Sequence, residues 1–178
     1  MATRDHAANP EQNLAYDWHS IFRYDAGRLF WKASPQKPKW WNTKYTGKRA
    51  GSVRQNKYRR VCVNGKAFQE HRIIYEMHHG PIPSGLLVDH KDGDESNNLL
   101  SNLRLATETQ NRLNSKTRSD NKTGHKGVSF IKSRGKFGAF LTVKGRRKFI
   151  GYFLDAESAG LAYMDAAKKE YGAFFRKG

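Results

Sequence analysis

Residues 88–98 read VDHKDGDESNN, and this stretch decides which fold is predicted for the chain. The apolar run that leads into it, residues 86–88, follows two prolines and indicates a short strand. Asp89 and His90 stand side by side where that strand ends. The residues after them are rich in Asp, Gly and Asn, which favour a loop. An acid and an imidazole are therefore presented together at the start of a polar loop.

The residues after this loop predict a second strand and a helix. Residues 103–106, LRLA, are a short apolar run consistent with a strand. Thr107 and Gln110 have the spacing of a capping box, which predicts that a helix begins there. The succession of strand, loop, strand and helix would bring four polar residues within reach of one another, namely Asp89, His90, Asn102 and Asn111.

These residue types suit the hydrolysis of a phosphodiester bond. The reaction needs a base that activates water and a cation that neutralises charge on the phosphate and the leaving oxygen. Histidine titrates close to neutral pH, so His90 can be the base. Asp89 and the amide oxygen of Asn111 are hard ligands for one Mg²⁺ or Mn²⁺ ion per active site. An Asn102 carbonyl that accepts a hydrogen bond from one ring nitrogen would fix the tautomer of His90.

A second interpretation of the same residues involves no chemistry. An adjacent Asp and His at a loop are commonly an ordinary surface pair, and the prediction of a site depends on the whole spaced pattern. Asn97 and Asn98 are expected to cap or tighten the loop. Five other histidines are expected to be packing or solvent residues, namely His6, His19, His78, His79 and His125.

The composition indicates a polyanionic partner. The chain has 178 residues and a formal net charge of +17, which favours nucleic acid first and an anionic membrane surface second. The single Cys62 excludes an internal disulfide and is consistent with a reducing compartment. The first residues contain no apolar core, so we expect no signal peptide, and no apolar run approaches the length of a membrane span. A cytoplasmic protein is expected.

The composition also divides the chain into segments. Residues 1–15 are polar and without periodicity, and we expect them to be disordered. A first domain over residues 16–115, a linker over 116–124 and a small second domain over 125–178 follow from the polar, glycine-bearing stretch between two apolar patterns.

A basic and aromatic segment lies before the site. Residues 28–72 contain thirteen Lys or Arg and one acid, Glu70, interleaved with Trp and Tyr. Such a segment can hold phosphates and stack on bases, or its aromatic residues can form a small core. Within it, Asn64 and Gly65 predict a hairpin turn, and residues 70–79 predict a short helix that ends at Gly80.

The predicted second domain contains three strands and a helix. Three runs, GVSFIK, KFGAFLTV and RKFIGYF, have the composition of short strands, and residues 155–171 predict a helix. Ala139, Leu141 and Val143 share the face that should meet the small residues of this helix. Nine Lys or Arg and no acid lie between residues 122 and 148, so the sheet should be basic and the helix closer to neutral.

The stretch VDHKDGDESNNLLSNLRLATETQN, with HRIIYEMHHGPIP before it, resembles the core of the HNH homing-type endonucleases over about residues 20–115. The resemblance implies a β-β-α metal finger in which His90 is the general base, Asn102 its orienter, and Asp89 and Asn111 the metal ligands. Asp89 stands where many relatives have His, which favours a hard ion over zinc. The upstream His-Arg pair places Arg72 near the DNA phosphates, or in core packing or a structural ion pair.

The segment from residue 124 to 174 resembles the APETALA-type DNA-binding domain of plant ethylene-response factors. The resemblance implies that the face of the sheet enters the major groove of DNA. The positions that match on this face are Lys126, Ser129, Arg134, Phe140, Thr142, Arg147 and Phe149.

The sequence thus predicts an α+β protein with a metal-finger catalytic domain, followed by a three-stranded antiparallel sheet packed on one helix. The function expected is metal-dependent cleavage of double-stranded DNA by a monomer or homodimer, with a His base and one divalent ion. A non-catalytic DNA-binding regulator and an RNA-binding protein are the alternatives.

Overall fold

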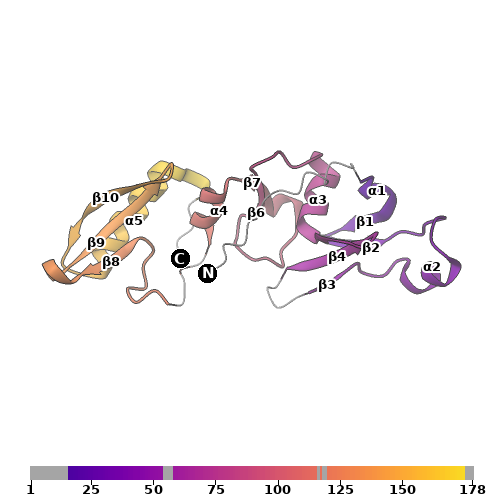
Figure 1. The fold of residues 1–178 in the computed structure, drawn as a ribbon, viewed down its shortest axis with the longest axis horizontal. Helices are drawn as coiled ribbons and strands as arrows, with labels where there is room; N and C mark the ends of the chain where they lie inside the picture. Colours follow the sequence, from indigo (N-terminus) through magenta and orange to yellow (C-terminus); the bar gives the residue numbers. More distant parts are fainter. Residues whose placement is uncertain (1–15, 54–57, 116, 118–119, 175–178) are drawn as a thin grey trace. The chain divides into compact units, whose positions relative to one another are not determined.

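The structure is a computed structural model that describes residues 16–53, 58–115, 117 and 120–174, so the expected disorder of residues 1–15 falls outside the described residues. The chain divides into two compact units between Leu105 and Ala106, and each unit is described by itself (Figure 1). This division falls earlier than the expected linker at 116–124, and residues 106–115 belong to the second unit. The mixed composition of helices and strands that the sequence predicts is confirmed.

The first unit begins with short elements that the sequence did not predict, ahead of the hairpin of β4 and β5, which it did. A one-turn helix leads into an antiparallel hairpin of β1 and β2, and α2 follows. A second sheet has the order β3-β4-β5 and is antiparallel. The bounds of these elements are α1 Trp18–Ile21, β1 Phe22–Asp25, β2 Arg28–Trp31, α2 Lys39–Tyr45, β3 Ser52–Val53, β4 Arg59–Val63 and β5 Lys66–Gln69.

Helix α3, Glu70–His79, is the central element of the first unit. It begins directly after β5 and ends at Gly80, as the sequence predicted, and Asn64 and Gly65 form the turn between β4 and β5. Ile73 and Ile74 are fully buried on its inner face. Because α3 packs against α1, β2, β4, β5 and β6, the residues at its start are surrounded by several segments of the chain.

The aromatic residues of the basic segment divide between a core role and an exposed one. Trp31 packs with its ring 5.3 Å from that of Trp41, and Phe22 lies 4.8 Å from Trp31 in the same cluster. Trp40 is exposed on α2. The core interpretation therefore holds for Trp31, and stacking of the exposed Trp40 on nucleic acid stays a prediction.

Strands β6, Leu87–His90, and β7, Leu103–Ala106, form a two-stranded sheet, as the apolar runs predicted. The loop between them ends in a 3-10 turn, η2 Leu100–Asn102, whose last carbonyl accepts the backbone N–H of Lys91 at 2.8 Å. Helix α4, Glu108–Asn114, follows in the chain. Its capping box of Thr107 and Gln110 is confirmed.

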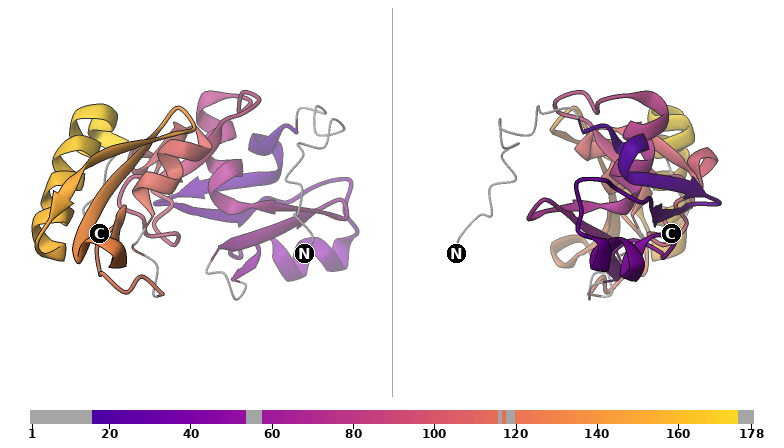
Figure 2. Two further views of the ribbon diagram at one scale, coloured as in Figure 1. Left: turned by 60° about the vertical axis from the view of Figure 1, so that its left-hand side comes forward. Right: turned by 90° about the vertical axis from the view of Figure 1, so that its right-hand side faces the viewer.

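The second unit holds α4 and a three-stranded antiparallel sheet in the order β10-β9-β8. Helix α5 runs along one face of this sheet (Figures 1 and 2). The bounds are β8 Val128–Ile131, η3 Lys132–Arg134, β9 Lys136–Val143, β10 Arg146–Phe153, α5 Ala156–Tyr171 and η4 Gly172–Phe174.

The core of the second unit lies between α5 and the sheet, and α4 contributes to it. Ala139 and Leu141 of β9 are buried against Ala159, Tyr163 and Ala167 of α5. Leu113 of α4 belongs to the same core. This packing explains why residues 106–115 group with the second unit.

Gly127, just before β8, is required by a close approach. It has a φ of +67°, and a Cβ at this position would lie 2.4 Å from the ring of Tyr163 and 2.5 Å from the carbonyl of Phe140. A side chain at residue 127 would therefore separate β8 from both β9 and α5.

We predict that Gly127→Ala destabilises the second unit by more than the roughly 1–2 kcal/mol that a left-handed backbone conformation costs an L-residue, because steric overlap adds to that strain. Gly124→Ala is the matched control, since Gly124 has a φ of +72° but no heavy atom within 4 Å of the added Cβ. Denaturant unfolding followed by circular dichroism measures both. Equal losses of stability would contradict the packing at Gly127.

Candidate active site

Asp89 and His90 are the last two residues of β6, and both are buried. The exposed fraction is 5% for Asp89 and 4% for His90. An ordinary surface pair would be solvated, so that interpretation of the two residues is wrong. The strand fixes the backbone of the pair, and the side chains are held by the surrounding segments.

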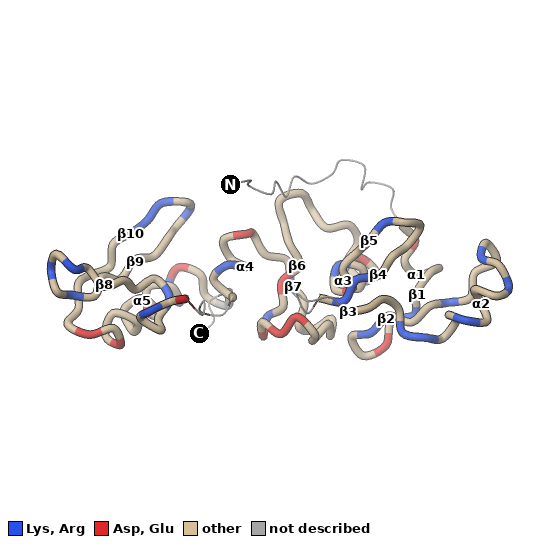
Figure 3. Tube along the Cα trace, turned by 60° about the horizontal axis from the view of Figure 1, so that its bottom comes forward, with Lys and Arg blue, Asp and Glu red and all other residues tan. Residues whose placement is uncertain are grey.

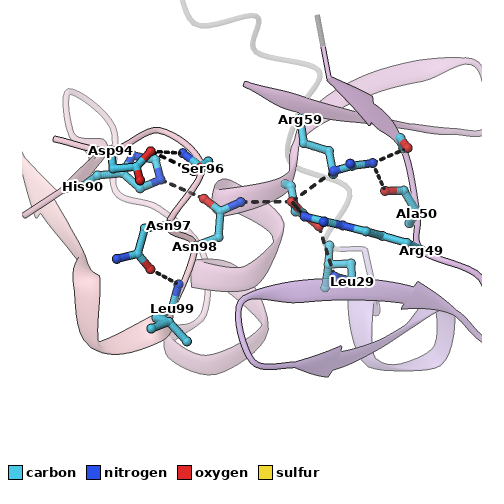
Figure 4. A network of polar contacts seen from close by, with 12 residues as sticks. Leu29, Arg49, Ala50, Arg59, His90, Asp94, Ser96, Asn97, Asn98 and Leu99 are labelled. Carbon is cyan, nitrogen blue, oxygen red and sulfur yellow. Dashed lines mark hydrogen bonds and ion pairs between the residues drawn. The ribbon is translucent and has the colours of Figure 1, made fainter. Parts of the chain in front are cut away.

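The imidazole of His90 is held by a buried amide and a buried carboxylate (Figure 4). Nε2 of His90 lies 2.8 Å from Oδ1 of Asn98, and Nδ2 of Asn98 donates to Oε2 of Glu70 at 3.0 Å. Asn98 is 3% exposed and Glu70 is 0% exposed. A continuous hydrogen-bonded path therefore runs from the first residue of α3 to the ring of His90.

The predicted contact between Asn102 and His90 is replaced by this contact with Asn98. Nδ2 of Asn102 donates to Asp92 at 2.9 Å and to the carbonyl of Asn97 at 2.8 Å, while its Oδ1 accepts the N–H of Asp92 at 3.1 Å. These bonds use both ends of the amide on the loop itself. The expected roles of Asn98 and Asn102 are thus exchanged: Asn102 closes the loop and Asn98 contacts the ring.

The loop between β6 and β7 is organised by its own polar side chains. Burial raises the pKa of Asp92, but hydrogen bonds from the Asp94 amide, Asn102 and Asn97 outweigh it and lower this pKa overall. Hydrogen bonds from the backbone and the hydroxyl of Ser96 likewise lower the pKa of Asp94. The loop is a run of turns closed by carboxylates, and it forms the acidic stretch between β6 and β7 in Figure 3.

Asp89 is held by an arginine from the paired strand. Oδ2 of Asp89 accepts from Nε of Arg104 at 2.9 Å, and a second guanidinium nitrogen lies 2.9 Å from the same oxygen. Carboxylate oxygens are the ligands that Mg²⁺ and Mn²⁺ prefer in proteins. Among the described residues, no group of three His, Cys, Asp or Glu is arranged to hold a metal ion. Asn111 lies on α4 in the second unit, and its approach to Asp89 stays a prediction.

Two aromatic rings cover His90. The ring of His71 is 4.9 Å from that of His90, and the ring of Tyr58 is 5.3 Å from that of His71. Burial, with smaller contributions from the charges of His90 and Arg72, lowers the pKa of His71 from 6.5 to about 3. Burial and the nearby negative charges of Glu95 and Asp89 raise the pKa of Tyr58. His71 is therefore neutral at physiological pH and packs as a ring, and half-buried Arg72 follows it on α3.

The sequence did not predict that Glu70 and its partners support His90 through Asn98. Glu70 accepts the backbone N–H of Leu29 at 3.1 Å and pairs with Arg49 at 3.5 Å and Arg59 at 3.8 Å. One signal was present, because Glu70 is the one acid within residues 28–72. The turn between β1 and β2 packs closely against the loop that carries Asn98. A Cβ on Gly27 would lie 3.0 Å from the carbonyl carbon of Asn98.

A basic cleft opens beside this network. Its volume is about 390 Å³, and it lies next to Asn97 and Asn98. Three arginines line it, Arg28, Arg49 and Arg59, together with Glu70, which pairs with two of them, and Glu95. Guanidinium groups of this kind are suited to phosphate oxygens.

In the second unit, strand register places five of the predicted DNA-contacting residues on the face of the sheet away from α5. Phe149 is opposite Phe140, and Arg147 is opposite Thr142, while buried Ala139 and Leu141 alternate with them on the other face. Ser129 is opposite Gly138 and completes the set. Phe149 remains 48% exposed, so the face offers aromatic surface as well as charge.

Two arginines on this face lie over aromatic rings. The guanidinium carbon of Arg147 is 3.7 Å from the ring centroid of Phe140, and that of Arg134 is 4.8 Å from the ring of Tyr152. Lys126 differs from the expectation, because its ammonium donates to the carbonyls of Leu113 and Ser115 at the end of α4. Lys126 therefore caps the end of α4. Figure 3 shows the remaining basic residues along the strands and turns of the sheet.

Comparison with known proteins agrees with this geometry. Residues 69–113, from the start of α3 to α4, match the family model described as HNH endonuclease. Protein 3.8 of Escherichia phage T7 is 40% identical over 82 residues, which cover 46% of this chain and 68% of that protein. The chain belongs to the HNH endonuclease family. HNH endonucleases are DNA-cleaving enzymes, and the buried His90 network lies inside the matched region.

Two other relatives of this HNH endonuclease are named for the same class. The uncharacterized HNH endonuclease L560 of Acanthamoeba polyphaga mimivirus is 37% identical over 107 residues, or 60% of this chain and 54% of that protein. The DNA endonuclease I-HmuI of Bacillus phage SP01 is 44% identical over 54 residues, or 30% and 31%. The structure of I-HmuI aligns with a TM-score of 0.39 at 22% identity, covering 86% of this chain and 78% of that one. No helix among the described residues is long and apolar enough to cross a membrane.

The lowered pKa of His71 predicts a pH dependence of stability in the HNH endonuclease. Between pH 6.5 and about 3 the unfolded chain binds a proton at residue 71 that the folded chain does not, so the free energy of unfolding should fall as pH decreases. The largest slope for one proton is about 1.4 kcal/mol per pH unit. Urea unfolding between pH 7 and 4.5, followed by tryptophan fluorescence, measures it, because all four tryptophans lie in the first unit.

His71→Phe should flatten this slope, because a phenylalanine at residue 71 cannot bind a proton when the chain unfolds. His79→Phe is the control, since His79 is an exposed histidine of the same helix. An unchanged slope in His71→Phe would contradict the assignment.

Proposed function

We propose that this protein is a homing-type DNA endonuclease that depends on a divalent metal ion and uses His90 as the general base. The observation that carries the proposal is the buried path from Glu70 through Asn98 to His90. The amide oxygen of Asn98 would fix the tautomer of the ring, and a base that accepts a proton at its other nitrogen needs a fixed tautomer.

The reaction proposed is hydrolysis of a phosphodiester bond. His90 takes a proton from water as the water oxygen attacks phosphorus, and the bond from phosphorus to the 3′ oxygen breaks. The products are a 5′ phosphate and a 3′ hydroxyl. Asn98 orients the base, and Asn102 closes the loop that carries Asn98.

A divalent cation fits the residues available at the proposed site. Asp89 supplies a carboxylate next to the base, and Asn111 would supply an amide oxygen from α4; both are hard ligands. When bound, Mg²⁺ or Mn²⁺ would stabilise the negative charge that develops on the phosphate and the leaving oxygen. Arg104 keeps the carboxylate of Asp89 in place in the absence of the ion.

We propose that DNA is held by both units. The open face of the β8–β10 sheet, which resembles an APETALA-type domain, presents Arg147 and Phe149 toward a duplex. The arginine-lined cleft beside Asn98 is suited to a phosphate close to the cleavage site. One site per chain would nick DNA, and a homodimer could cut both strands. In the alternative of a non-catalytic regulator, the same surfaces would bind DNA without cleavage.

The test is cleavage of supercoiled plasmid by the full-length protein in Mg²⁺ or Mn²⁺. We predict nicked or linear product, loss of cleavage in EDTA, and a rate about 10² to 10⁴ lower for His90→Ala with DNA affinity maintained, because a base contributes to the rate and little to binding. His79→Ala is the control and should cut at the rate of the unchanged protein. Binding without cleavage would favour the regulator, and full activity of His90→Ala would remove His90 from the mechanism.

The DNA-binding role of the sheet is tested by Arg147→Ala. Loss of one phosphate contact should reduce the slope of log affinity against log salt by about 0.9 on duplex DNA. Lys168→Ala removes the same charge from α5, on the other side of the sheet, and should leave the slope unchanged. A fluorescence anisotropy titration over a salt series measures both slopes, and equal slopes for the two variants would mean that this face does not contact DNA.

A further inference from the structure

Glu70 is a buried charge whose two oxygens are both used as acceptors. Oε1 accepts the backbone N–H of Leu29 at 3.1 Å, and Oε2 accepts Nδ2 of Asn98 at 3.0 Å. Arg49 also reaches Oε2 at 3.5 Å, and Nε of Arg59 lies 3.8 Å away. The carboxylate is therefore surrounded by donors and has only acceptor atoms to offer to its neighbours.

This carboxylate determines which way the amide of Asn98 points. An acceptor oxygen at 3.0 Å requires the NH₂ group of Asn98 on that side, so the amide oxygen faces the ring of His90. The amide oxygen can only accept, so Nε2 of His90, 2.8 Å away, carries the hydrogen. A neutral imidazole has one N–H, so Nδ1 is then the nitrogen that carries no hydrogen.

We propose that Glu70 is a positioning residue for DNA cleavage, which keeps His90 in the tautomer whose Nδ1 accepts the proton by acting through Asn98. This inference rests on the proposed role of His90 as base. A carboxylate is required at residue 70 because an amide could present either a donor or an acceptor to Asn98. The paired arginines offset the cost of burying this charge.

The alternative is that Glu70 only joins α3 to β2 and β4, and conservative substitutions separate the two roles. In Glu70→Gln the side-chain oxygen is needed by the N–H of Leu29, so the NH₂ group faces Asn98. The amide of Asn98 then turns its oxygen toward residue 70 and its NH₂ toward Nε2 of His90. Nε2 becomes an acceptor, the proton moves to Nδ1, and the base is blocked.

A second substitution should reverse this effect. Asn98→Asp added to Glu70→Gln gives residue 98 two acceptor oxygens, one for the NH₂ group of residue 70 and one for Nε2–H of His90. The double variant keeps the total charge and nearly the total volume of the two side chains, because the carboxylate and the amide exchange places. Asn98→Asp alone places two carboxylates at hydrogen-bonding distance and should also lower the rate.

The experiment compares the unchanged full-length protein with both single variants and the double variant. Single-turnover cleavage at saturating DNA should fall about 10²- to 10⁴-fold in Glu70→Gln, as expected for loss of a base held in its working tautomer, and should recover to within about tenfold in the double variant. Affinity for DNA in Ca²⁺ should be the same in the unchanged protein and the double variant, because the charge of the cleft that residues 70 and 98 line is the same in both.

A second readout does not depend on activity. In the metal-free protein, ¹⁵N spectra of the imidazole nitrogens should place the His90 proton on Nε2, move it to Nδ1 in Glu70→Gln, and return it to Nε2 in the double variant. A proton on Nδ1 in the unchanged protein overturns the inference even where a variant fails to fold. So does an active Glu70→Gln, or a double variant that folds without recovering. Inactivity of the unchanged protein, or an active His90→Ala, would instead count against the proposed function.

Discussion

The first unit is organised around one buried negative charge. Glu70 is withdrawn from water at the start of α3, and an unpaired carboxylate in that position costs several kcal/mol. Its hydrogen-bond donors come from β2, from the segment before β3 and from the loop after β6, and Arg59 of β4 forms an ion pair with it at 3.8 Å. Because each donor belongs to a different segment, satisfying this carboxylate fixes how those segments are arranged around α3.

The loop that carries the site is held at two points for two different reasons. Asn98 faces inward and connects the loop to the buried charge, whereas Asn102 stays within the loop and bonds Asp92 and Asn97. Asp89 is fixed separately by Arg104 from the neighbouring strand. His90 and Asp89 are thus held by partners from different segments, Asn98 and Arg104.

Local signals in the sequence were sufficient for many elements. The capping box at Thr107, the turn at Asn64 and Gly65, and the end of α3 at Gly80 depend on neighbours a few residues apart, and the structure has all three. Two partners of Glu70, Asn98 and Leu29, lie 28 and 41 residues away, and no local pattern identifies them. Asn98 and Asn102 are the same residue type in the same loop, so the sequence could not decide which one faces the ring. Leu113 likewise shows no local sign that its helix packs in the second unit.

A crystal structure of the protein with a DNA duplex and Ca²⁺ would show whether Glu70 and Asn98 hold His90 with its Nδ1 toward the DNA. Ca²⁺ is chosen because it should permit binding with poor turnover. We predict that Nδ1 of His90 faces the scissile phosphate and its attacking water, while Nε2 stays hydrogen-bonded to Asn98 and Asn98 stays hydrogen-bonded to Glu70. A structure in which Nε2 faces the phosphate, or in which His90 lies away from the DNA, would contradict it.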